Sequence, residues 1–229
     1  SGGLRSDIAM LEHSDDHFLS DDVSSIAMLR IYQGALLRLL PGRIGKFAVL
    51  RNIGSCLTAY GKKIADAPPL VMVPGGPTWD LSTVMGIEFT SLVAMPGVFG
   101  VSGDISSLDG NQRAELKRCI DFFKKWRSVI AGSVAHLLTP PRPKDDRAGW
   151  AAIQLSHKAT GIQLLFAYRL IDQSHLKFFA LKGLDRAASY SVTNGLAGES
   201  RTATGAALSD EGVAVQLASE CTAAVFVVE

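Results

Sequence analysis

The residues best suited to chemistry lie near the start of the chain, where two carboxyl groups follow a glycine-rich stretch. Asp21 and Asp22 are adjacent, and each disfavours the ionisation of the other, which raises a pKa towards the range that a general acid needs. Gly2 and Gly3 have no Cβ, so their backbone can approach a ligand closely. The pattern fits an acid/base loop beside a binding site. It fits an ordinary helix N-cap as well, because an apolar helical run follows.

That apolar run predicts a helix over residues 22–40, in which either carboxylate can cap the first turn. The residues that return at helical intervals are Ile26, Leu29, Leu36, Leu37 and Leu40. Pro41 and Gly42 end the run. The helix would therefore place Asp21 at the junction between a loop and a helix N-terminus, the position from which α/β barrels present catalytic groups.

A second helix is predicted over residues 108–131, with Asp109 as its N-cap. Its apolar stripe consists of Leu116, Ile120, Phe123, Trp126 and Ile130, and core packing explains it. Between the two helices, residues 43–105 combine short apolar runs with glycine and proline, which favours strands and loops over long helices.

The character of the chain changes at residues 139–147, TPPRPKDDR, which hold three prolines and five charges. The short apolar or alternating runs beyond this stretch are residues 150–156, 162–170, 176–181, 189–193, 213–217 and 223–228. Such runs, separated by turn signals, predict an antiparallel sandwich or barrel. We therefore expect an α/β domain over 1–140, a linker over 141–147 and an all-β domain over 148–229.

Composition argues against several function classes. The net charge is +1 and the basic residues are scattered, which is unlike a nucleic-acid surface. No run of 18 apolar residues is present, so no membrane span is expected. The three cysteines match no metal or disulfide pattern, which slightly favours a cytoplasmic location. His13 and His17 flank two aspartates without a third ligand of matching spacing, so a polar loop is favoured over a metal site.

The stretch SGGLRSD, the later SDD and the Arg-Ile of the following helix together resemble a segment of family 36 glycoside hydrolases, the α-galactosidase family. There the same pattern forms the last active-site strand and the loop after it. Residues 99–105 with the 108–131 helix, and residues 181–185 and 208–229, resemble later parts of the same family. The resemblance implies the C-terminal part of a (β/α)8 TIM barrel followed by an antiparallel β-sandwich domain. It also implies that residue 1 is a cut within a longer enzyme.

In that family the reaction is retaining hydrolysis of terminal α-linked galactose from oligosaccharides of the melibiose and raffinose type. The resemblance places the general acid/base on Asp21 and a backbone contact with the substrate on Gly2. The nucleophile, an Asp in a Lys-x-Asp motif, would precede Ser1, so the isolated chain is expected to be inactive. The expected partners are an oligosaccharide and the N-terminal part of the same enzyme, and a homo-oligomer is compatible with the sequence. No cofactor and no metal are implied.

Two other function classes stay open, and the first is a related enzyme that acts on a different α-linked sugar. Where many relatives have a His-containing segment, this chain has Ile44-Gly45-Lys46-Phe47, which leaves the sugar specificity open, including α-glucosides or N-acetylgalactosaminides. The second class is a non-catalytic carbohydrate-binding or structural module. The sequence encoded before Ser1 separates these classes: Cys-Ala and a Lys-x-Asp strand favour the enzyme, and a start codon favours the module.

Overall fold

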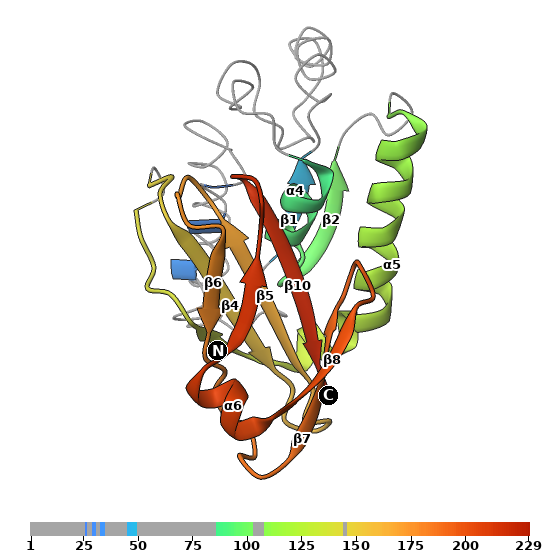
Figure 1. The fold of residues 1–229 in the computed structure, drawn as a ribbon. Helices are drawn as coiled ribbons and strands as arrows, with labels where there is room; N and C mark the ends of the chain where they lie inside the picture. The colour runs from blue at the N-terminus through green and yellow to red at the C-terminus, as the bar shows by residue number, and fades with distance from the viewer. Residues whose placement is uncertain are drawn as a thin grey trace, which may run out of the picture.

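The computed structural model describes residues 26, 29–30, 33–34, 45–49, 86–102, 108–143 and 146–229. Figure 1 shows an α/β part, with a parallel strand pair and helices, beside a larger antiparallel part. The named helices are α4 (Ile87–Ala94), α5 (Gly110–Gly132) and α6 (Gly205–Asp210), and residues 26, 29–30 and 33–34 are helical as well. None of the helices in these ranges is long and apolar enough to cross a bilayer.

The α/β part is built on two parallel strands. β1 (Gly45–Val49) pairs with β2 (Val98–Ser102), with Gly45 opposite Val98. Parallel neighbours need a crossover connection, and α4, which the sequence did not predict, lies between the two strands in the chain and contacts both. An α/β part at this place in the chain is thus confirmed. Closure into a barrel stays a prediction.

Helix α5 follows the sequence prediction closely. The Asp109 carboxylate accepts a hydrogen bond from the Gln112 amide at 2.8 Å, and the Gln112 side chain accepts one from the Asp109 amide at 3.0 Å. The predicted stripe is shifted slightly, because Phe122 is buried and Phe123 is only partly buried. Trp126 is buried, as expected for a core residue.

The antiparallel part centres on a six-stranded sheet of order β3-β4-β5-β10-β7-β8. Its strands are β3 (Val134–Leu137), β4 (Trp150–Ser156), β5 (Gln163–Arg169), β7 (Ser189–Asn194), β8 (Ser200–Thr204) and β10 (Thr222–Val228). Every neighbouring pair runs antiparallel. The last strand, β10, lies between β5 and β7, so residues from the end of the chain complete the middle of the sheet.

The central strands of this sheet are buried on both faces, and their side chains alternate between two apolar clusters. The face towards α4 and α5 carries Ala151, Ile153, Leu155, Leu164, Phe166, Tyr168, Val225 and Val227. The opposite face carries Trp150, Ala152, Leu165, Ala167, Ala224 and Val228. Because neither face meets water, the strands are almost continuously apolar instead of alternating.

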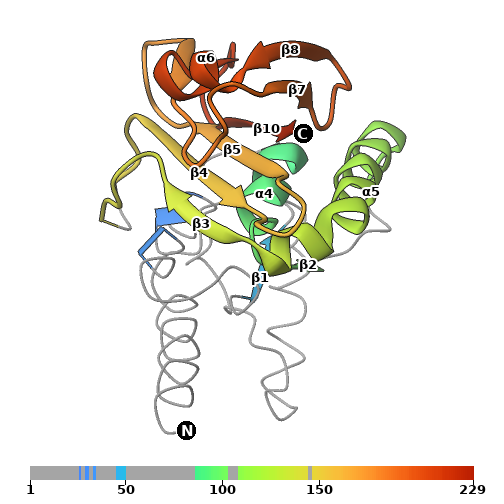
Figure 2. The same ribbon diagram turned by 90° about the horizontal axis from the view of Figure 1, so that it is seen from below.

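Different elements cover the two faces, as Figure 2 shows for α4 and α5 on one side of β4 and β5 and α6 on the other. A second, two-stranded antiparallel sheet of β6 (Leu176–Phe179) and β9 (Val213–Gln216) joins α6 on the outer face. The antiparallel sandwich predicted from the sequence is therefore confirmed. On the inner face the Tyr168 hydroxyl donates to the carbonyl oxygen of Leu92 in α4 at 2.8 Å, which ties the sheet to the α/β part.

Six predicted strands match β4, β5, β6, β7, β9 and β10 within a few residues, whereas β3, β8 and α6 were not predicted. β3 matters most for the architecture, since it precedes the predicted linker and yet pairs with β4, with Val134 opposite Ser156. The same apolar cluster also takes in residues of α4 and α5. The sheet thus includes chain from before residues 141–147, and the division into two domains there stays a prediction.

Two glycines with positive φ offer a matched test of the outer layer. Gly212 follows α6 at φ +90°, and a Cβ there would lie 2.5 Å from the carbonyl carbon of Phe179. Gly198 has φ +81° but open space around it. Gly198→Ala is expected to lower the free energy of unfolding by about 1–2 kcal/mol, the cost of the left-handed backbone. Gly212→Ala has the same backbone cost, and overpacking against β6 should lower its free energy of unfolding by about 1–3 kcal/mol more. Equal melting temperatures for the two variants would contradict this packing.

Candidate functional site

The two site residues predicted from the sequence, Asp21 and Gly2, lie outside the described residues. So do His13 and His17, and among the residues that the structure does describe no cluster of potential ligands could hold a metal ion. The described residue closest after Asp21 in the sequence is Ile26, which is helical. The described residues nearest to the two carboxyl groups in the sequence thus belong to the helix that follows them.

This helix presents one buried face to the rest of the molecule. Ile26 and Leu29 are 1% and 0% exposed and belong to the same apolar cluster as the inner face of the large sheet. Arg30 and Gln33 are buried on the same face, at 1% and 0% exposed. The predicted helix is confirmed at these residues, and two long polar side chains enter an otherwise apolar contact.

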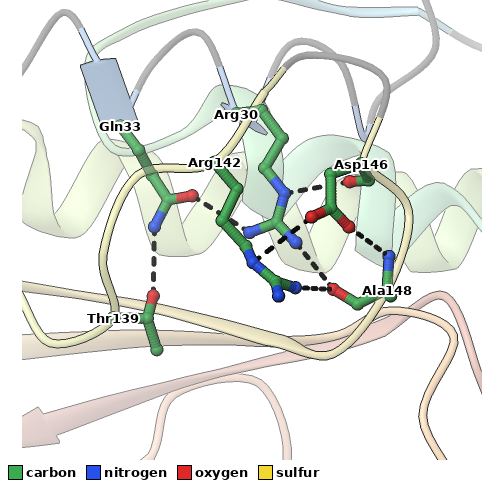
Figure 3. Close-up of polar contacts among 6 residues, drawn as sticks. All are labelled: Arg30, Gln33, Thr139, Arg142, Asp146 and Ala148. Atoms are coloured by element: carbon green, nitrogen blue, oxygen red, sulfur yellow. Dashed lines mark hydrogen bonds and ion pairs between the residues drawn. The ribbon is translucent and has the colours of Figure 1, made fainter.

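Arg30 uses its buried guanidinium to bind backbone carbonyls (Figure 3). Its Nε donates to the carbonyl oxygen of Asp146 at 3.1 Å, and one terminal nitrogen donates to that of Ala148 at 2.8 Å. The other terminal nitrogen donates to Oε1 of Gln33 at 3.3 Å. A side chain on the helix thus holds the chain segment that leads into the first long strand of the sheet, β4.

Gln33 extends the same connection into the sheet. Its Nε2 donates to the Thr139 hydroxyl oxygen at 3.1 Å, and that oxygen also accepts the backbone amide of Ala152 in β4 at 3.0 Å. We call Arg30, Gln33, Thr139 and the carbonyls of Asp146 and Ala148 the helix anchor. It connects the helix after Asp21 to both ends of the segment between β3 and β4.

A second arginine stiffens that segment from within. Arg142 forms an ion pair with the Asp146 carboxylate, at 3.3 Å between Nε and Oδ2, and also donates to the carbonyl of Ala148 at 3.1 Å. The other carboxylate oxygen of Asp146 accepts the Ala148 amide at 2.9 Å. Ala148 therefore receives one arginine from the helix and one from its own segment, as Figure 3 shows.

The electrostatics of the anchor are those of a buried cation. Burial lowers the pKa of Arg30, the nearby Asp146 carboxylate raises it, and Arg142 lowers it again. A guanidinium nevertheless stays protonated in a protein and needs an acceptor for its donors. Backbone carbonyls supply most of these acceptors here, so the arrangement fixes position and carries out no acid/base chemistry itself.

The sequence interpretation missed this anchor. Arg30 entered it only as part of the Arg-Ile pair, and residues 141–147 were interpreted as a linker. A signal was present, because Arg30 and Gln33 share the helical stripe of Ile26 and Leu29. A polar residue on an apolar stripe indicates a buried partner. The identity of that partner depends on a contact between residues more than 100 positions apart, which no local pattern contains.

The fold described above is similar to part of the solved structures of family 36 α-galactosidases. AgaA from Geobacillus stearothermophilus, in a variant bound to raffinose, superposes with a TM-score of 0.66 at 19% identity over 90% of this chain. AgaB from the same organism gives 0.65 at 20% identity over 90%. The galactosidase domain of the α-galactosidase–sucrose kinase AgaSK gives 0.65 at 18% identity over 89%. These likenesses establish the fold.

The sequence comparison leads to the same family. The chain is 24% identical to the curated α-galactosidase AgaA of Geobacillus stearothermophilus over 194 residues, which is 83% of this chain. The chain is therefore similar to the family 36 α-galactosidases in sequence and in fold. It spans 22% of the length of AgaA and 24% of each of the three solved chains. No family model matches it.

The hydroxyl of Thr139 offers a direct test of the anchor. Thr139→Val keeps the shape of the side chain but removes the acceptor for Gln33 and Ala152, so the free energy of unfolding should fall by about 1–3 kcal/mol. Thr139→Ser keeps the hydroxyl and loses only a methyl group, at a cost of about 1 kcal/mol or less. Urea unfolding of both variants checks the difference, and the same loss in both would show that the hydroxyl is unimportant.

Proposed function

We propose that this chain supplies the C-terminal part of a retaining α-galactosidase that removes terminal α-linked galactose from oligosaccharides of the raffinose and melibiose type. The main support is the match to AgaA over 194 residues, which is 83% of the chain. AgaA structures have been solved with raffinose and with stachyose, which are galactosides of this class. In this proposal the nucleophile lies in sequence that precedes Ser1.

The reaction needs two carboxyl groups about 5–5.5 Å apart on either side of the glycosidic bond. One attacks the anomeric carbon while the other protonates the leaving oxygen, and the second then deprotonates the water that releases galactose. We assign Asp21 to the second role and the backbone of Gly2 to a sugar contact. Asp22, next to Asp21, would help to keep the Asp21 carboxyl protonated until the bond breaks.

The described residues support this assignment through the helix that follows Asp21. A general acid must hold its proton within hydrogen-bond reach of the leaving oxygen, so its loop needs a rigid structural support. The helix anchor and the apolar contacts of Ile26 and Leu29 fix the helix to the sandwich. The sandwich would therefore act as the support of the acid/base loop.

A non-catalytic carbohydrate-binding module is the alternative, and sequence upstream of Ser1 separates the two. A Cys-Ala pair directly before Ser1, with a Lys-x-Asp strand further upstream, would favour the enzyme. A start codon at that place would favour the module. A related enzyme that acts on a different α-linked sugar would share the first outcome and differ in the substrates that it turns over.

Replacement of Asp21 tests the proposed chemistry in the protein encoded by the complete reading frame. Asp21→Ala should lower kcat/KM for raffinose by about 100-fold or more, because the leaving oxygen loses its proton donor. An activated aryl α-galactoside needs little protonation, so its kcat/KM should change little, and azide should raise its kcat. Asp22→Ala is the matched control, with a much smaller loss on raffinose.

Unchanged raffinose turnover in Asp21→Ala would remove Asp21 from the acid/base role. The chain of residues 1–229 alone provides a further check on the proposal. Because it holds only one of the two carboxyl groups, it should show no turnover of an aryl α-galactoside. Turnover at enzyme-like rates by this chain would contradict the proposed division of the site.

A further inference from the structure

We propose that Arg30 is a positioning residue for the acid/base loop: by binding the carbonyls of Asp146 and Ala148, it sets the placement of the helix that follows Asp21. The inference rests on the proposed function, and it gives a catalytic purpose to a residue that touches no substrate. Its basis is that one side chain of this helix binds two carbonyls of a segment far away in the sequence.

The geometry of the contact restricts the helix in a way that apolar packing does not. Apolar side chains such as Ile26 and Leu29 tolerate small shifts, because the hydrophobic effect has no direction. The guanidinium is planar and its donors are fixed relative to one another. Bonds of 3.1 and 2.8 Å to two carbonyls two residues apart therefore define both the rotation and the displacement of the helix.

The choice of a charged residue at this place also favours a positioning role. Burying a cation carries a desolvation cost, and apolar residues of similar volume often replace buried charges without loss of stability. Methionine at position 30 has a similar length and would leave the apolar contacts of Ile26 and Leu29 with the sheet in place. Stability alone thus does not require the guanidinium, whereas a defined placement of the helix does.

Arg142 provides an internal comparison. It also donates to the carbonyl of Ala148, at 3.1 Å, but it belongs to the same segment as that carbonyl. Its side chain is 44% exposed, and its ion pair with Asp146 also stays within the segment. Loss of Arg142 would loosen the segment without releasing the helix, because, of these two arginines, only Arg30 belongs to the helix.

A displaced acid has a recognisable kinetic signature. A shift of about 1 Å in a catalytic group can reduce the rate by about 100-fold. The reduction should appear in kcat/KM for substrates whose leaving group needs a proton, such as raffinose. It should be nearly absent for an activated aryl α-galactoside, whose bond breaks without one. A general loss of folded enzyme would lower both values by the same factor.

The experiment compares Arg30→Met with Arg142→Met in the protein encoded by the complete reading frame. For Arg30→Met, kcat/KM for raffinose should fall by about 10- to 100-fold while kcat/KM for the activated aryl substrate changes less than about twofold. Azide should raise kcat on the aryl substrate, as in a variant that lacks the acid/base. Arg142→Met should keep both values close to those of the unsubstituted enzyme.

Arg30→Lys serves as a second variant, since it keeps the charge but loses the two-carbonyl geometry; it should give the same selective loss on raffinose. Equal losses on both substrates in Arg30→Met and Arg30→Lys, or no loss in either, would overturn the inference. If the unsubstituted complete protein turns over neither galactoside, the proposed function itself has failed. The two failures are therefore distinguishable.

Discussion

The buried guanidinium of Arg30 is the contact on which the relation between the two parts of this chain depends. It is 1% exposed, and the carbonyls of Asp146 and Ala148 accept hydrogen bonds from it out of a segment far away in the sequence. A cation without acceptors in such a place would be strongly destabilising. The helix can therefore bury its apolar face only where those carbonyls lie, and its placement follows from that condition.

The inner face of the large sheet is the apolar surface against which this helix packs. Since β4, β5 and β10 bury both faces, the sheet has an apolar core on each side. One core is shared with α4 and α5, and the other with β6, β9 and α6. A sheet covered in this way is a rigid platform for the helices on its inner face. The Tyr168 hydroxyl adds a hydrogen bond to α4 on that face. The sandwich thereby holds both α4 and the helix of Arg30.

Local patterns were enough to predict much of the architecture. The Asp109 cap, the α5 helix and six of the strands are encoded by neighbouring residues, and their predicted bounds agree with the structure within a few residues. β3 and β8 were not predicted, because β3 has only four residues directly after α5 and β8, SRTAT, is mostly polar, so neither forms a separate apolar run. The helix anchor was not predicted, because the acceptors of Arg30 in the distant segment are backbone carbonyls, which no side-chain pattern marks. The assignments of Asp21 and Gly2 came from family resemblance, and they concern residues outside the described ranges.

The central claim is that Asp21 is the group that protonates the leaving oxygen. A crystal structure of the complete protein with a sulfur-linked galactoside, which is not hydrolysed, tests it most directly. The account predicts an Asp21 carboxyl oxygen at about 3 Å from the linking sulfur and about 5–5.5 Å from a second carboxylate across the bond. An Asp21 carboxylate that only caps the following helix, turned away from the bound sugar, would contradict it.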